Sequence, residues 1–147
     1  MRRSSQSILN YTYKRLRHQG LPSVKRQGKD DGFPGPHSAC RYRENEKKDC
    51  PVKCAIGHLI PNGQYHARLE GLTVGGMETI YKDLFDKIRP TDMDRWTGGA
   101  FLSDLQLAHD TYTEYMDNPT SGRIPWEDHL DRQYRMIAKE FNLIFPE

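Results

Sequence analysis

Hydrophobic positions recur at helical spacing near the start of the chain. Over residues 4–19, Leu9, Tyr13 and Leu16 lie three or four residues apart, serines precede them, and Gly20 follows. Residues at this spacing share one face of an α-helix, and serine and glycine favour its first and last positions. The pattern therefore predicts a first helix over residues 4–19.

Three further helices are predicted after residue 76. One runs from Met77 to the residue before Pro90, because proline disfavours helical geometry in the residue that precedes it. Another runs from about Gly99 to Met116, and the last starts near Pro125, a residue suited to a first helical turn. The positions predicted to face inward are Ile80, Leu84, Ile88, Phe101, Leu105, Ala108, Tyr112, Trp126, Leu130, Tyr134, Ile137 and Phe141.

Residues 39–56 have a different pattern, which leaves two interpretations open. Alternating hydrophobic positions from Val52 to Ile56 favour two short strands around a polar turn. Alternatively, a helix begins at Cys54 and places Cys54 and His58 on one face. The expected fold class is mainly α (α+β), with four to five helices and a small irregular or two-stranded β element around residues 39–56.

The length and composition indicate one modest core. The chain has 147 residues, of which 35% are hydrophobic and 29% charged, a polar balance that allows only a thin core. A stretch rich in proline and glycine occupies residues 21–39. We therefore predict a basic N-terminal helix and flexible loop over residues 1–37, followed by a single globular domain over residues 38–147.

Charge is unevenly distributed along the chain. The net charge is only +2, too small by itself to indicate nucleic-acid binding, but no acidic residue precedes Asp30. Such a block suits phosphates or an acidic protein surface, and it is also typical of a solvated helix face. The predicted partner-binding residues are Arg2, Arg3, Lys14, Arg15, Arg17, Lys25 and Arg26.

The sequence favours a cytoplasmic location. It contains no run of eighteen apolar residues, and polar residues 4–7 stand where a signal peptide would need its apolar region. The three cysteines are an odd number, which gives no reason to expect a disulfide framework. We expect thiols or metal ligands, and no membrane contact.

The cysteines and histidines permit a metal site. Cys40, Cys50, Cys54 and His58 supply enough thiolate and imidazole ligands for tetrahedral zinc. Metal binding would add folding energy to a thin core. The spacing, however, matches no common zinc finger. Zinc is therefore one candidate cofactor, and the other expectation is a protein without a cofactor.

Covalent catalysis and a purely structural role are the alternatives. Cys54 at a helix start would be favoured as a thiolate, with His109 as its base and Asp104 or Asp110 orienting the ring. A cysteine is equally suited to a buried position, because it behaves as a small apolar residue. The sequence leaves these interpretations open.

Four segments carry a resemblance to a known family: Cys40-Arg41-Tyr42-Arg43, Cys54-Ala55-Ile56-Gly57-His58-Leu59-Ile60-Pro61, Leu69-Glu70-Gly71 and Leu105-Gln106-Leu107-Ala108-His109-Asp110. Together they resemble small proteins encoded in bacteriophage and prophage genomes, over roughly residues 38–143. Cys50 and the long basic lead-in depart from that pattern. The resemblance implies an infected bacterial cell as the setting and binding to a host macromolecule as the mode of action.

The leading interpretation is thus a small phage-type protein of the host cytoplasm. It would bind a host protein or nucleoprotein complex and modulate it without catalysing a reaction, using the basic N-terminal segment, which would also allow contact with nucleic acid. The second interpretation is a cysteine-dependent hydrolase or transferase that uses Cys54 and His109. A zinc-stapled binding module is the third.

Overall fold

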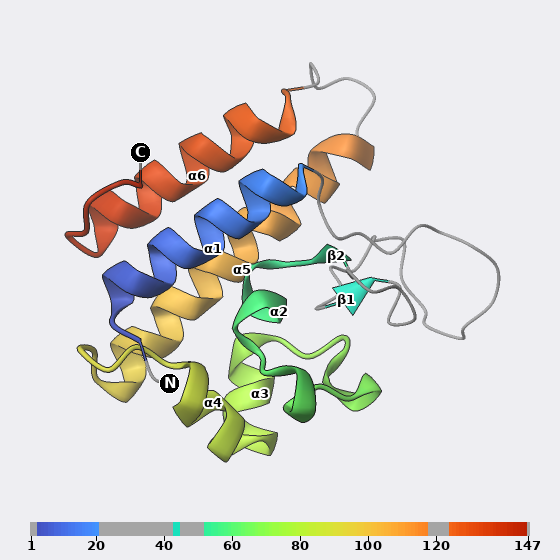
Figure 1. Cartoon of the computed structure of the whole chain (residues 1–147), viewed down its shortest axis with the longest axis vertical. Coiled ribbons are helices and arrows are strands. Elements are labelled where there is room, and N and C mark those ends of the chain that lie inside the picture. The colour runs from blue at the N-terminus through green and yellow to red at the C-terminus, as the bar shows by residue number, and fades with distance from the viewer. Residues whose placement is uncertain (1–2, 21–42, 45–51, 118–123, 147) are drawn as a thin grey trace, which may run out of the picture.

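The computed structural model describes residues 3–20, 43–44, 52–117 and 124–146 (Figure 1). These residues form a mainly helical protein, as predicted, and no helix among them is long and apolar enough to cross a membrane. Two short 3-10 helices, η1 and η2, lie between α2 and α3. The α-helices among the described residues are α1 (Ser5–Gln19), α2 (Ala55–Leu59), α3 (Val74–Ile80), α4 (Lys82–Ile88), α5 (Arg95–Asp117) and α6 (Trp126–Glu140). The 3-10 helices are η1 (Asn62–Gln64) and η2 (Ala67–Leu69).

Helix α1 forms where the sequence predicts it. The Ser4 hydroxyl oxygen accepts a hydrogen bond from the backbone N–H of Ser7 at 3.3 Å, which caps the first turn. Gly20 ends the helix with a positive φ of 72°, a conformation that glycine adopts without steric cost. The predicted stripe of Leu9, Tyr13 and Leu16 is buried. Local sequence therefore determines both ends and the inner face of this helix.

The inner face of α1 belongs to the main core. Ile8, Leu9 and Leu16 are at most 1% exposed and lie in one hydrophobic cluster with buried residues of α2, α5 and α6. Figure 1 shows α1 between α6 and α2, with α5 behind it. The predicted domain boundary at residues 37 and 38 lies outside the described residues. Within the described residues, α1 is a core helix.

The predicted inward positions of α5 and α6 are confirmed except at Tyr112 and Phe141, which are only partly buried against the core. Phe101, Leu105 and Leu130 are fully buried. Helix α5 begins at Arg95, four residues before the predicted start, because the Asp94 carboxylate accepts hydrogen bonds from the backbone N–H and the hydroxyl of Thr97, at 2.8 and 2.9 Å. This arrangement is an N-terminal cap.

The single helix predicted from Met77 to Pro90 is wrong. Tyr81, with φ −121° and ψ 55°, leaves helical geometry and separates α3 from α4. Ile80, predicted to face inward, is the last residue of α3 before this break and is 61% exposed. Leu84 and Ile88, which follow the break, are buried as predicted.

The cysteine-containing segment resolves into a short ladder and a helix. Strands β1 (Arg43–Glu44) and β2 (Val52–Lys53) pair antiparallel, with Arg43 opposite Lys53. The predicted strand over residues 51–56 is wrong beyond Lys53, because residue 55 begins α2 and Cys54 caps it. Most of the first predicted strand, residues 39–43, lies outside the described residues. The helical alternative for Cys54 is therefore the correct one.

The start of α1 is anchored by a distant carboxylate. The Asp92 side chain accepts hydrogen bonds from the backbone N–H and the hydroxyl of Ser5, both at 2.8 Å. The Thr91 backbone N–H donates to the Arg3 carbonyl at 3.0 Å. Partial burial raises the pKa of Asp92, but the hydrogen bonds from Ser5 together lower it by more. The pKa of Asp92 therefore lies below its ordinary value. The anchor is therefore strongest when Asp92 is ionised.

Replacing Asp92 with asparagine is expected to lower the free energy of unfolding at neutral pH by about 1 to 2 kcal/mol, because a charged acceptor at a helix start is lost. Since the folded-state pKa is depressed, this stabilisation is complete above the unfolded pKa of about 3.8 and disappears as the pH falls below it. Urea denaturation of both proteins across acidic pH measures the difference. The control is Asp83, an exposed carboxylate in the first turn of α4. Asp83→Asn also removes a charge at a helix start, and it should lower the free energy of unfolding by only about 0.5 kcal/mol. An Asp92→Asn difference that persists at strongly acidic pH would contradict the anchor.

Candidate binding surface on helix α1

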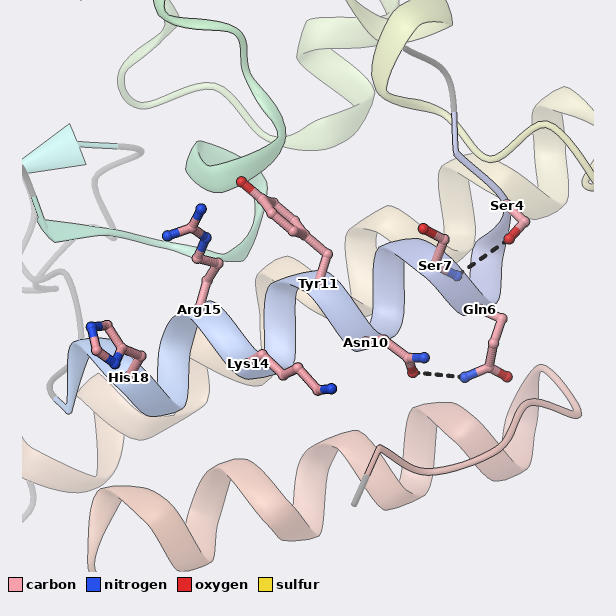
Figure 2. A pocket seen from close by; sticks show the side chains of 8 residues that line it. All are labelled: Ser4, Gln6, Ser7, Asn10, Tyr11, Lys14, Arg15 and His18. Carbon is pink, nitrogen blue, oxygen red and sulfur yellow. Dashed lines mark hydrogen bonds between the residues drawn. The ribbon is translucent and has the colours of Figure 1, made fainter.

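The outer side of α1 carries an open hollow. Tyr11, Lys14, Arg15 and His18 follow one another at helical spacing and share this side (Figure 2). The volume of the hollow is about 890 Å³. Its lining consists of Ser4, Gln6, Ser7, Asn10, Tyr11, Lys14, Arg15 and His18. We call this set the α1 surface.

Two arginine side chains stack on the ring of Tyr11. The guanidinium carbon of Arg3 lies 4.1 Å from the ring centroid, and that of Arg15 lies 5.3 Å from it. A cation above an aromatic face is attracted by the quadrupole of the ring. The half-buried Tyr11 ring packs against the core, so it gives both guanidinium groups a fixed support.

The edge of the α1 surface nearest α6 is an ordered amide network. The Gln6 side-chain nitrogen donates to Asn10 Oδ1 and to the Ile144 carbonyl, each at 2.8 Å. The Ile144 backbone N–H donates back to Gln6 Oε1 at 2.8 Å. These bonds tie the C-terminal segment to α1 (Figure 2 shows the Gln6–Asn10 bond). Within this network, Asn10 accepts a hydrogen bond through its side-chain oxygen, and its side-chain amide nitrogen is not used.

Arg17 has a different role from its neighbours. Its Nη1 lies 2.6 Å from Asp131 Oδ1 and 3.1 Å from the Tyr13 hydroxyl, which itself donates to Asp131 at 2.6 Å. Burial, followed by the hydrogen bond to Asp131, raises the pKa of Tyr13, so its hydroxyl stays protonated. Arg17 thus joins α1 to α6, and the Asp131 carboxylate offsets its charge.

The α1 surface therefore contains part of the predicted partner-binding set. Lys14 and Arg15 line the hollow and are exposed, and Arg3 lies next to it, over the Tyr11 ring. The predicted binding residues Arg2, Lys25 and Arg26 lie outside the described residues. No acidic residue occurs in α1 or in the described residues before it, so the exposed charge on this surface is positive.

Cys54 is enclosed at the start of α2. Its side chain is 0% exposed, and its Sγ accepts a hydrogen bond from the backbone N–H of Gly57 at 3.4 Å. The thiol thereby occupies the N-cap position that the sequence interpretation expected at a helix start. A substrate would reach this sulfur only if the surrounding residues moved.

His109 is also enclosed, on α5. Its side chain is 0% exposed, its ring packs edge to face on Trp126 at 5.6 Å between centroids, and its Nδ1 lies 3.7 Å from Asp110 Oδ1. Neither the hydrogen bond that Cys54 accepts from Gly57 nor the contacts of His109 with Trp126 and Asp110 connects the thiol to the imidazole. The catalytic role of Cys54, His109 and Asp110 stays a prediction.

Only two of the four predicted zinc ligands are among the residues that the structure describes. Cys40 and Cys50 lie outside the described residues. Cys54 caps the start of α2, and the half-buried His58 lies in its last turn. Among the residues that the structure describes, no group of three or more His, Cys, Asp and Glu side chains is arranged to hold a metal ion. Zinc binding likewise stays a prediction.

Sequence reasoning missed the polar and aromatic members of the α1 surface. Tyr11 and His18 were not among the predicted binding residues, although they share the helical spacing of Lys14 and Arg15. Tyr11 and His18 could have been identified from their spacing of three to four residues from Lys14 and Arg15, which places all four on the polar side of the helix. The contribution of Gln6 had no local signal, because its partner Ile144 is 138 residues away.

The comparisons with known proteins return no match: no family model, no curated protein and no solved structure corresponds to this chain. The resemblance to phage-encoded proteins accordingly stays a prediction.

Proposed function

We propose that this protein is a non-enzymatic binding protein whose α1 surface docks on an acidic face of a host protein or nucleoprotein complex and modulates that complex. The setting is the infected bacterial cell that the phage-type resemblance implies. The observation that carries the proposal is the exposed pair Lys14 and Arg15 beside the Tyr11–Arg3 stack, on a helix without acidic residues.

The arrangement of charge supports docking. An uncompensated patch attracts an oppositely charged surface over roughly one Debye length, about 8 Å at physiological salt. Arg17 adds less to this attraction, because its Nη1 lies 2.6 Å from Asp131 Oδ1 and the carboxylate offsets its charge. Lys14 and Arg15 are therefore the cations of α1 that a partner would meet.

Accessibility also favours binding over catalysis. The sulfur and the imidazole that a cysteine-dependent mechanism would use are each 0% exposed. The polar groups of α1 line an open hollow instead. A broad, open and charged surface suits a macromolecule better than a small substrate, which is usually held in an enclosed cleft.

Replacing Lys14 and Arg15 together with alanine is expected to reduce capture of the partner about five- to thirtyfold, because two exposed charge contacts are worth about 1 to 2 kcal/mol in total. The measurement is capture from a bacterial lysate by the tagged protein, quantified by mass spectrometry. Alanine is a strong helix former, so α1 should keep its structure, which circular dichroism can check.

The matched control is Lys87→Ala with Arg68→Ala. Both side chains are exposed and lie outside the α1 surface, on α4 and on η2. This variant loses the same two charges, one lysine and one arginine, and should capture the partner like the wild type. Equal capture by the Lys14/Arg15 variant and the wild type would overturn the proposed surface.

A further inference from the structure

The lining of the α1 surface consists of polar, basic and aromatic residues. Of its eight residues, none is aliphatic and none is acidic: it holds serine, glutamine, asparagine, tyrosine, lysine, arginine and histidine. Interfaces between proteins usually have an apolar centre surrounded by a polar rim. The α1 surface has no aliphatic side chain for such a centre, and two guanidinium groups lie over its tyrosine ring.

The same composition fits phosphate groups. Most hydrogen bonds from proteins to nucleic-acid backbones come from arginine and lysine, and from serine, asparagine, glutamine and tyrosine side chains. Interfaces with nucleic acid are also more polar and more positively charged than those with protein. Lys14 and Arg15 supply charge, and Ser7 and Asn10 supply neutral polar groups on the same side of α1 (Figure 2).

The stack on Tyr11 prepares two guanidinium groups for anions. Arg3 and Arg15 each hold their guanidinium carbon within 5.3 Å of the Tyr11 ring centroid. A guanidinium group that rests on a ring keeps its N–H donors at the edge of its plane, where phosphate oxygens bind. Ordering these side chains before binding reduces the entropy lost when a ligand arrives.

The position of α1 indicates which part of a nucleic acid it meets. The helix packs between α2 and α6 (Figure 1) and buries its inner face in the core. Recognition helices that read bases enter the major groove of DNA. A helix flanked on both sides is suited to the outer backbone instead, and phosphate contacts carry no sequence information.

From these observations we infer that the acidic partner of the α1 surface is the phosphate backbone of a nucleic acid, bound without sequence preference. This inference rests on the proposed function and names the chemistry of its partner. Arg3, Lys14 and Arg15 neutralise phosphates, and Tyr11 positions the two arginines.

The test measures fluorescence anisotropy of labelled oligonucleotides with the full chain. Single-stranded DNA, single-stranded RNA and duplex DNA, each in two unrelated sequences, distinguish the source of the phosphates. With three cations engaged, log affinity should fall against log salt with a slope of about −2 for single strands or about −3 for a duplex. The two sequences of each kind should bind equally.

Two variants separate charge from positioning. Lys14→Ala with Arg15→Ala should weaken binding about five- to thirtyfold and make the salt slope shallower by about 1.5. Tyr11→Leu keeps every charge and an apolar side chain, so it should weaken binding with an unchanged slope. Lys87→Ala with Arg68→Ala should leave both quantities at their wild-type values. Thermal melting of each variant verifies that it is folded.

The outcomes distinguish this inference from the proposed function. A labelled polyglutamate peptide that binds as tightly as the oligonucleotides would overturn the nucleic-acid assignment. The nucleic-acid assignment would also be overturned if the protein bound no oligonucleotide but still captured a partner from a nuclease-treated lysate through Lys14 and Arg15. That result would leave the proposed function intact. Oligonucleotide binding that ignores the Lys14/Arg15 substitution would overturn the α1 surface itself.

Discussion

Replacing Leu9 with alanine is expected to lower the free energy of unfolding by about 3 to 5 kcal/mol, the range seen when a fully buried leucine is truncated and the surrounding core closes only partly. Leu9 is 0% exposed and lies on α1 within the main hydrophobic cluster. Because typical domains are stable by only about 5 to 15 kcal/mol, this one substitution should remove a large share of the total. Urea denaturation followed by circular dichroism measures the loss.

Leu107 provides the matched control for Leu9. It undergoes the same substitution within a helix, α5, but its side chain is 55% exposed. Leu107→Ala should change the free energy of unfolding by less than about 1 kcal/mol, because little apolar area is lost and alanine favours the helix. Equal destabilisation by the two substitutions would show that α1 does not form part of the core.

The packing of α1 has a consequence for experiments on the α1 surface. Deletion of the N-terminal segment would remove Ile8, Leu9 and Leu16 together with the basic side chains, and it would expose the faces of α2 and α6 that α1 covers. Loss of binding by a truncated chain would then report loss of the fold. Substitutions of exposed residues such as Lys14 avoid this difficulty.

Acid destabilisation through His129 is the second large expected effect. The His129 side chain is 3% exposed on α6, and its Nε2 donates to the Ala108 carbonyl of α5 at 2.8 Å. Its ring also lies parallel to that of Trp126 and packs on Tyr112. The residue therefore joins α6 to α5 through one hydrogen bond, to Ala108, and one aromatic contact, with Tyr112.

The surroundings of His129 disfavour its charged form. Burial lowers the pKa of His129, the hydrogen bond to the Ala108 carbonyl partly opposes this, and repulsion by His109 and Arg132 lowers it further. The folded pKa thus lies below the unfolded value of about 6.5. Below that pH the unfolded chain binds a proton that the folded chain does not, so stability should fall by up to about 1.4 kcal/mol per pH unit.

His129→Gln tests this expectation, since glutamine retains a donor and does not titrate. The variant should lose about 1 to 2 kcal/mol of stability at neutral pH, through weaker aromatic packing. It should lose less further stability than the wild type as the pH falls below the unfolded pKa of about 6.5. Urea denaturation at several pH values measures both. His18→Gln, at an exposed position of α1, should reproduce the wild-type pH profile. A His129→Gln profile parallel to that of the wild type would contradict the buried-histidine account.

The sequence by itself determined the helices whose signals are local. Ser4 and Gly20 mark the ends of α1, Pro125 precedes α6, and the spacing of Leu9 and Leu16 gives the inner face of α1. These features depend on neighbours within one or two helical turns, which a sequence pattern contains in full.

Only the tertiary structure decided which side chains are accessible. The sequence presented Arg17 beside Lys14 and Arg15 as equivalent cations, yet Arg17 pairs with a carboxylate 114 residues away. It presented Cys54 and His109 as candidates for chemistry, and packing from other helices encloses both. The break at Tyr81 likewise has no local signal in the hydrophobic pattern. Ion pairs and burial depend on residues brought together from distant parts of the chain, so periodicity, which reports only local geometry, does not contain them.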